Sequence, residues 1–280
     1  MHATVWGCRG SIASPGPETV RYGGNTACVE VRPEHGPLIV LDAGTGIRRL
    51  GINCDLEGVR EIHLVLTHLH LDHVEGLGFF SPLWGGEVTL HIWGPSSPVE
   101  GLADRIAHYL SPPLFPVELK DIPGTISFHD VPEDEWKIGS VRLRAQPIAH
   151  PGPTVGYRIE EDGHSLAYLP DHEPALAGHF GARAPEWISG FSLAAHADVL
   201  VHDAQFTEGE YPAKIGWGHS SVAHAVDFAR RTEASRLVLF HHDPARSDED
   251  LDRLGQHAQE LWGERGNSPA VAFEGMRIEL

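Results

Sequence analysis

The chain has 280 residues, with 21 basic and 39 acidic side chains and a formal net charge of −18 at neutral pH. An apolar fraction of 41% and a charged fraction of 21% are ordinary for a globular protein and exclude a disordered chain. No run approaches the roughly 18 apolar residues that cross a bilayer. Three irregularly spaced cysteines do not make a disulfide framework, and no secretory signal is visible, so we expect a cytosolic (cytoplasmic) protein.

Short runs rich in β-branched and aromatic residues predict most of the secondary structure. The first half contains five predicted strands, which are Thr4–Cys8, Asn25–Val31, Leu38–Asp42, Glu61–Leu66 and Val88–Trp93. The second half contains six, which are Val141–Ala145, Thr154–Ile159, Ser165–Leu169, Val199–Asp203, Arg236–Phe240 and Met276–Leu280. Between the halves, the proline-rich residues 95–147 predict a lid-like excursion over the core, with one helix at Val99–Tyr109.

Capping residues and apolar spacing predict two further helices in the second half. Ser220 is a candidate cap for a helix that begins near Val222, and Asp248 is a candidate cap for a helix that carries Leu251 on its apolar face. Two strand-rich halves, each with its own helices, predict two packed sheets with helices outside. The sequence contains no recognisable linker, so we predict a single domain over residues 1–280.

The densest cluster of metal-binding side chains follows the predicted strand at residues 61–66. The segment HLHLDH places His68, His70, Asp72 and His73 within six residues. On an extended chain, His68 and His70 project alike and can bind one ion, while Asp72 and His73 lie beyond the bend and can reach a second. Imidazole and carboxylate together suit Zn²⁺, with Mn²⁺ or Fe²⁺ as alternatives. We therefore predict a metal site.

This H-x-H-x-D-H pattern at the end of a strand resembles the signature of the metallo-β-lactamase superfamily, and the likeness covers nearly the whole chain. The segment LDAGTG, with Asp42 and Gly44, is similar to the family's strand-ending Asp-x-Gly, whose aspartate supports the metal-binding loop. The order of the later motifs resembles the branch of ribonuclease Z and the cyclic phosphodiesterases. The resemblance implies an α/β fold, the four-layer αββα sandwich, in agreement with the predicted elements.

In that branch, later residues complete a site for two divalent metal ions. The resemblance implies one ion bound by His68, His70 and His150, a second bound by Asp72, His73 and His241, and Asp171 as the bridge between them. His164 and His172 compete with His150, but only His150 precedes the Gly-Tyr strand that the branch places there. Asp203 also ends a strand, but in the branch that position holds an acidic residue beside the ligands.

The remaining histidines are assigned by their positions relative to the strands. His241 is preferred over its neighbour His242 because of its place directly after the strand. We expect His63, His202 and Asp42 to support the ligands or the fold rather than to bind metal.

His219, in the segment WGHSS, resembles the proton-donor histidine of the branch. In phosphodiester hydrolysis the leaving alkoxide needs a proton, and histidine is the usual donor near neutral pH. The alternative is a surface histidine beside a helix cap. Asp72 would orient the attacking hydroxide, so Asp72 and His219 are the predicted catalytic residues.

The resemblance therefore implies a metal-dependent phosphodiesterase. Ribonuclease Z-like enzymes carry a long arm that grips tRNA, usually between the third histidine and the bridging aspartate, whereas only 20 residues separate His150 from Asp171. Together with the acidic surface, this favours a small substrate, such as a cyclic nucleotide or a cyclic ribose phosphate, over an extended nucleic acid.

Three other functions remain as alternatives to a small-molecule phosphodiesterase. They are a ribonuclease Z-like tRNA 3′ endonuclease, an acyl hydrolase (a lactonase, thioesterase or lactamase) and a non-catalytic metal-binding module. We expect no membrane partner. A homodimer is left open, and so is a phosphate contact by Arg9.

Overall fold

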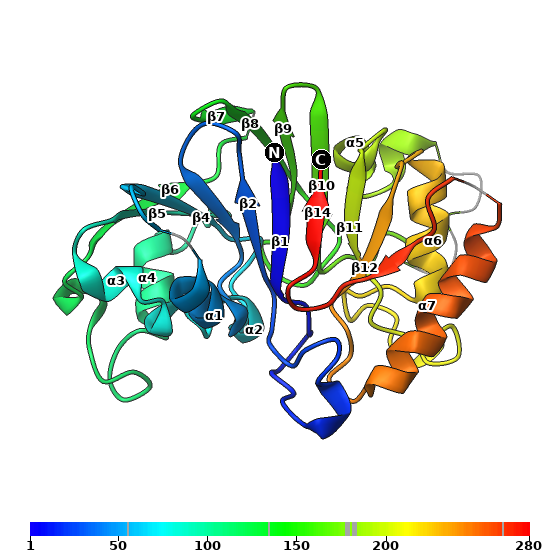
Figure 1. The fold of residues 1–280 in the computed structure, drawn as a ribbon, viewed down its shortest axis with the longest axis horizontal. Helices are drawn as coiled ribbons and strands as arrows, with labels where there is room; N and C mark the ends of the chain where they lie inside the picture. Colours follow the sequence, from blue (N-terminus) through cyan, green and yellow to red (C-terminus); the bar gives the residue numbers. More distant parts are fainter. Residues whose placement is uncertain (55, 134, 177–179, 181–183, 265) are drawn as a thin grey trace.

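The computed structural model describes residues 1–280 except 55, 134, 177–179, 181–183 and 265. Its strands form two seven-stranded sheets that face each other, and helices cover the outer face of each sheet (Figure 1). The four-layer αββα sandwich is thereby confirmed. Across the described residues, no helix combines the length and apolar character that a membrane crossing demands.

The first sheet has the order β14-β1-β2-β3-β4-β5-β6. Its strands are β1 (His2–Gly7), β2 (Cys28–Arg32), β3 (Leu38–Leu41), β4 (Glu61–Val65), β5 (Thr89–Gly94), β6 (Thr125–Asp130) and β14 (Arg277–Glu279). Strands β3 to β6 run parallel, and β3 is buried on both faces, which explains its uninterrupted LIVL sequence. The helices on this side are α1 (Gly46–Asn53), α2 (Leu71–Val74), α3 (Pro82–Gly85) and α4 (Leu102–Ala107).

The second sheet has the order β13-β12-β11-β10-β9-β8-β7. Its strands are β7 (Trp136–Ile138), β8 (Val141–Pro147), β9 (Val155–Glu161), β10 (His164–Leu169), β11 (Val199–Asp203), β12 (Leu237–Phe240) and β13 (Ala270–Val271). Strands β10 to β13 run parallel, and β7 to β10 run antiparallel. The helices on this side are α5 (Phe191–Ala194), α6 (Val222–Arg231) and α7 (Asp248–Trp262).

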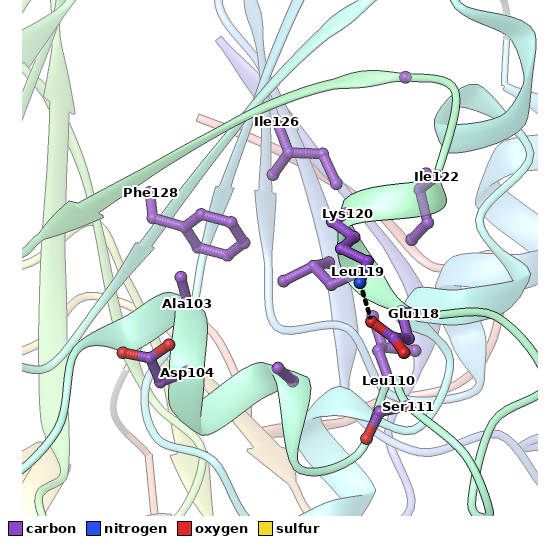
Figure 2. Close-up of a pocket in the computed structure, with 12 residues that line it drawn as sticks. Ala103, Asp104, Leu110, Ser111, Glu118, Leu119, Lys120, Ile122, Ile126 and Phe128 are labelled. Carbon is purple, nitrogen blue, oxygen red and sulfur yellow. Dashed lines mark ion pairs between the residues drawn. The ribbon is translucent and has the colours of Figure 1, made fainter.

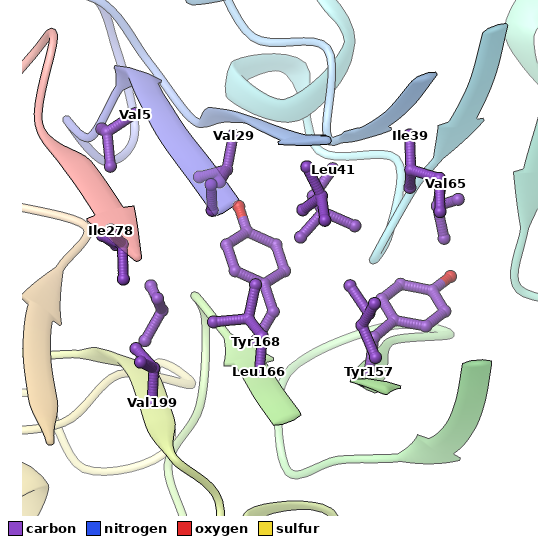
Figure 3. Packing of buried hydrophobic residues seen from close by; sticks show 14 of the residues in the cluster. Val5, Val29, Ile39, Leu41, Val65, Tyr157, Leu166, Tyr168, Val199 and Ile278 are labelled. Carbon is purple, nitrogen blue, oxygen red and sulfur yellow. The ribbon is translucent and has the colours of Figure 1, made fainter. Parts of the chain in front are cut away.

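The apolar layer between the sheets holds the two halves of the chain together. Leu41 and Val29 of the first sheet face Leu166 and Tyr168 of the second (Figure 3). The buried hydroxyl of Tyr157 donates a 2.6 Å hydrogen bond to the carbonyl oxygen of Leu66, two residues before His68 of the metal-binding motif. The packing of this layer therefore also positions the loop after β4.

Both predicted helix caps lie one residue away from the observed ones. Ser221, rather than Ser220, caps α6, and Ser247, rather than Asp248, caps α7. The side chains of Ser220 and Asp248 instead bind backbone groups of other segments. At α7, the Ser247 hydroxyl accepts the backbone N–H of Asp250, whose carboxylate in turn accepts the backbone N–H of Ser247, which is a capping box.

The proline-rich residues 95–147 are built into the sandwich, which differs from the lid-like excursion expected from the sequence. Their first part holds α4, and Leu102, Ile106 and Phe115 pack against the outer face of the first sheet. Their second part supplies β6, β7 and β8, and β6 and β7 each form a sheet edge. The prolines and turns around β6 and β7 conceal these short edge strands in the sequence.

A pocket of about 440 Å³ opens on the outer side of the first sheet, between α4 and β6 (Figure 2). Ile126 and Phe128 of β6 line it, together with the ion pair between Glu118 and Lys120. None of the residues predicted to bind metal lines this pocket, so it is separate from the candidate site.

The capping box of α7 gives a test of the corrected helix boundary. Ser247→Ala removes the acceptor of the Asp250 backbone N–H, and we expect the free energy of unfolding to fall by about 1 kcal/mol in urea denaturation. Ser235→Ala, at an exposed serine outside any helix, is the control and should stay within about 0.5 kcal/mol of the unsubstituted protein. Equal losses in the two variants would contradict the assignment.

Candidate metal centre

The candidate ligands meet at one edge of the sandwich, where strands of both sheets end. His68 and His70 follow β4, Asp171 follows β10 and His241 directly follows β12. His150 lies in the loop before β9. Their side chains form two adjacent groups, in each of which one donor atom per residue lies within 4.8 Å of the others.

The first group consists of His68, His70 and His150. The Nε2 of His150 lies 3.1 Å from the Nδ1 of His70, and the rings of His68 and His70 are 4.4 Å apart. The Nδ1–H of His150 donates a 2.9 Å hydrogen bond to the carbonyl of Gly218, which leaves its Nε2 with a lone pair toward the group. His70 is exposed, so the group is accessible to solvent.

The second group consists of Asp72, His73, Asp171 and His241, all of them buried. The Nε2 of His241 lies 3.2 Å from an oxygen of Asp72 and 3.2 Å from an oxygen of Asp171. The Nε2 of His73 lies 3.0 Å from the other oxygen of Asp171. Asp171 also lies 3.8 Å from the Nε2 of His68, so its carboxylate stands between the two groups.

A buried carboxylate below the motif orients both His68 and His73. Asp42 accepts hydrogen bonds from the backbone N–H and hydroxyl of Thr67, from the Nδ1–H of His73 at 2.9 Å and from the hydroxyl of Tyr168. Because the Thr67 hydroxyl donates to Asp42, it accepts the Nδ1–H of His68 at 3.0 Å. The Nε2 of His68 is buried without a hydrogen-bond partner. The Nε2 atoms of His68 and His73 therefore both face the ligand groups.

The charges at the centre call for a cation. Burial by itself raises the pKa of Asp171. The imidazoles of His241, His73 and His68 have the larger effect in the opposite direction, so the pKa lies well below its usual range. Burial lowers the pKa of His241, but the carboxylates of Asp171 and Asp72 raise it to about 9. The carboxylates therefore remain ionised and favour positive charge between the side chains. The donor set and the unpaired Nε2 of His68 fit divalent metal ions.

His219 lies beside both groups without belonging to either ligand set. Its ring stacks on that of His241 at 4.8 Å and meets that of His150 at 5.1 Å. The Nδ1–H of His219 donates a 2.6 Å hydrogen bond to Asp203, whose carboxylate also accepts the backbone N–H of Ser220. Asp203, the competitor for the bridging position, thus holds His219 and leaves the Nε2 of that ring free to face a ligand.

Unusual backbone geometry completes the centre. Ser11, Asp42 and His241 have φ angles of 62°, 59° and 59°, in the left-handed region that non-glycine residues seldom adopt. The backbone N–H of Ser11 donates a 2.7 Å hydrogen bond to Asp72. Gly10 lies so close to His241 that a Cβ would stand 2.3 Å from its ring, so this position accepts only glycine.

The competing residues lie outside the two ligand groups. His164 is exposed, and His172 is buried against His202, with 3.0 Å between their ring nitrogens. The Nε2–H of His242 donates a hydrogen bond to the carbonyl of Ala272, so this side chain is used within the fold, whereas His241 belongs to the second ligand group. His63 stacks on His91 in the first sheet, at a ring separation of 4.6 Å.

Arg9 contacts neither a phosphate site nor the surface. Its fully buried guanidinium donates to the carbonyls of Gly23 and Arg246, so it anchors the N-terminal loop. These bonds hold the guanidinium within the protein interior.

Glu173 is an important residue of the site that the sequence did not single out. This buried carboxylate accepts the backbone N–H groups of Gly216 and Gly218 and the hydroxyl of Tyr211. It thereby fixes the loop whose Gly218 carbonyl orients His150. Its position two residues after Asp171 is the signal that could have identified it.

Removing one donor from either group tests the ligand assignment. His68→Ala and Asp171→Ala should each lose most of the bound divalent metal, measured by elemental analysis of folded protein after reconstitution. His164→Ala removes an exposed histidine on β10 and should keep the full metal content. A folded His68→Ala protein with unchanged metal content and affinity would contradict the assignment.

Comparison with known proteins identifies the family. A profile described as the beta-lactamase superfamily domain matches residues 38–242. A protein named ribonuclease Z from Myxococcus xanthus is 26% identical to this chain over 88% of this chain and 89% of the relative. Another of that name, from Limosilactobacillus fermentum, is 28% identical over 81% of this chain and 82% of the relative. The crystal structure of the metallo-beta-lactamase fold protein YhfI from Bacillus subtilis matches with a TM-score of 0.70 at 17% identity and covers 99% of both chains. The chain therefore belongs to the metallo-β-lactamase superfamily, in the branch of its ribonuclease Z relatives, and is a metal-dependent hydrolase.

Proposed function

We propose that this protein uses two divalent metal ions to hydrolyse a small phosphodiester, and we favour Zn²⁺ as the metal. The observation that carries the proposal is the pair of adjacent donor groups on either side of Asp171, with His219 beside both. His68, His70 and His150 would hold one ion, and Asp72, His73 and His241 the other. Ions bound there lower the pKa of a coordinated water and neutralise the charge of the phosphoryl oxygens.

The protein's own side chains supply orientation and a proton. Asp72 is held by the backbone N–H of Ser11 and would orient the attacking oxygen. His219 would protonate the leaving alkoxide from Nε2, because Asp203 engages its Nδ1–H and fixes the orientation of the ring. Acyl transfer with a good leaving group does not need such a donor, which favours phosphodiester over acyl chemistry. The complete donor set weighs against a non-catalytic module.

The segment between His150 and Asp171 supports a small substrate. After a short loop, it consists of the antiparallel hairpin β9–β10, and both strands lie within the second sheet. The hairpin leaves no room there for an arm that could grip tRNA. The net charge of −18 also disfavours a long polyanion. We therefore favour a cyclic nucleotide or a cyclic ribose phosphate as substrate.

Removal of tRNA 3′ trailers is the second candidate function, and the names of the curated relatives favour it. The same metal chemistry would serve both reactions, because each cleaves a phosphodiester. The two candidates differ in how the substrate outside the scissile phosphate is held, so substrate comparison can separate them.

The proposed role of His219 predicts an effect that depends on the leaving group. His219→Ala should retain its metal and lose roughly 10²–10⁴-fold in kcat for a diester with an alkoxide leaving group. The loss should be much smaller for a p-nitrophenyl ester, because nitrophenolate leaves without a proton. Equal losses on the two substrates, measured by steady-state kinetics, would remove His219 from the proton-donor role.

Substrate size gives the second prediction of the proposed function. A cyclic mononucleotide carries one phosphate charge that the metal ions can offset, whereas precursor tRNA needs many contacts from basic side chains. We expect higher kcat/KM for cyclic mononucleotides or cyclic ribose phosphates than for tRNA 3′ trailers, β-lactams or thioesters. Efficient trailer removal without cleavage of cyclic diesters would establish the second candidate instead.

A further inference from the structure

An exposed tryptophan lies on the loop that carries His219 and contacts His150. Trp217 lies two residues before His219, and the carbonyl of Gly218, between them, accepts the Nδ1–H of His150. The side chain of Trp217 is nevertheless 58% exposed. An exposed aromatic ring on a loop that also carries active-site groups is available for contact with a ligand.

The loop that carries Trp217 is rigidly held. The backbone N–H groups on both sides of Trp217, from Gly216 and Gly218, donate to the buried carboxylate of Glu173. The backbone N–H of Trp217 donates to the carbonyl of Lys214 at 3.0 Å, which closes a tight turn. The indole is therefore presented on a fixed backbone, a property that reduces the entropic cost of binding a ligand.

One face of the indole carries a positive charge. The ammonium of Lys214, one of only three lysines in the chain, lies 3.7 Å from the centroid of the Trp217 ring. Among the described residues, no carboxylate lies within 4 Å of this ammonium. Lys214 is also 5.9 Å from the ring of Phe206, which packs edge-on against His219 at the same ring distance. The cation and the indole are thus connected to the catalytic histidine through one aromatic contact.

Two further exposed apolar side chains belong to segments that contact the centre. Ile12 follows Ser11, whose backbone N–H binds Asp72, and Leu71 lies between His70 and Asp72. Both Ile12 and Leu71 are exposed. Exposed apolar side chains next to ligand-bearing segments favour a substrate with an apolar face over a bare sugar phosphate, whose surface is rich in hydroxyl groups.

We propose that Trp217 binds an aromatic base by stacking, with Lys214 near the phosphate charge, so that the substrate is a cyclic nucleotide rather than a cyclic ribose phosphate. This inference rests on the proposed phosphodiesterase function and narrows its substrate class. Stacking on an aromatic side chain is tolerant of base identity because every base has a π-face. Purine and pyrimidine nucleotides should both be accepted.

A matched substrate pair tests the role of Trp217. Adenosine 2′,3′-cyclic phosphate and glycerol 1,2-cyclic phosphate contain the same five-membered cyclic diester, with and without a base. Trp217→Ala should lower the ratio of their kcat/KM values about tenfold, mainly through a higher KM for the nucleotide, which is the size of one lost stacking contact. Trp217→Phe should restore most of the ratio. Trp187→Ala, at another exposed tryptophan, is the control and should leave the ratio unchanged.

Inhibition of the unsubstituted enzyme gives a second measurement that does not depend on how a variant folds. The product 3′-AMP should inhibit competitively at a concentration about tenfold lower than glycerol 1-phosphate does. Equal inhibition by the two products, or equal losses on both substrates in Trp217→Ala, would overturn the stacking role. Failure of the metal-loaded enzyme to cleave these diesters or any other cyclic nucleotide would instead contradict the proposed function itself.

Discussion

The buried carboxylate of Asp42 is the constraint on which the metal centre depends. It sits at the end of β3, in a left-handed backbone conformation, and has no exposed surface. Its oxygens bind Thr67 and His73 of the motif and Tyr168 of the opposite sheet. A buried carboxylate is stable only when such donors surround it, so the same bonds join the motif to both halves of the sandwich. The orientation of His68 and His73 follows from this arrangement.

The second constraint is electrostatic. Asp72 and Asp171 are buried among imidazoles, and the Nε2 of His73 has no proton to donate to Asp171 when the ring is neutral, because its Nδ1–H already donates to Asp42. A cation between them satisfies the oxygens and the Nε2 atoms together. The buried carboxylates at this edge of the fold thus favour bound positive charge, and the chain as a whole carries a net charge of −18.

Local motifs carried most of what could be predicted from the sequence. The segment around His68 and His70 was recognisable because its donors are adjacent, and the long apolar runs of β3, β11 and β12 marked buried strands. The family resemblance added His150, Asp171 and His241, and the structure places their side chains in the two groups.

The features that the sequence did not reveal depend on contacts between distant segments. The backbone N–H of Ser11 binds a carboxylate 61 positions away, and Glu173 supports a loop 43 to 45 positions away. The sequence likewise does not show that the Arg9 guanidinium is buried and donates to carbonyl groups of distant segments. The helix caps were one residue out because two adjacent polar residues compete for each cap, and only the packing decides between them.

The contact between Asp72 and His241 joins residues that are 169 positions apart and belong to different sheets. Contacts of such separation form only after the entropy of closing a long loop has been offset by other packing. The second donor group therefore cannot exist in a half-folded chain, although the motif after β4 can form locally with its own sheet. A metal ion bound by all four residues of this group therefore requires that the two sheets have already docked.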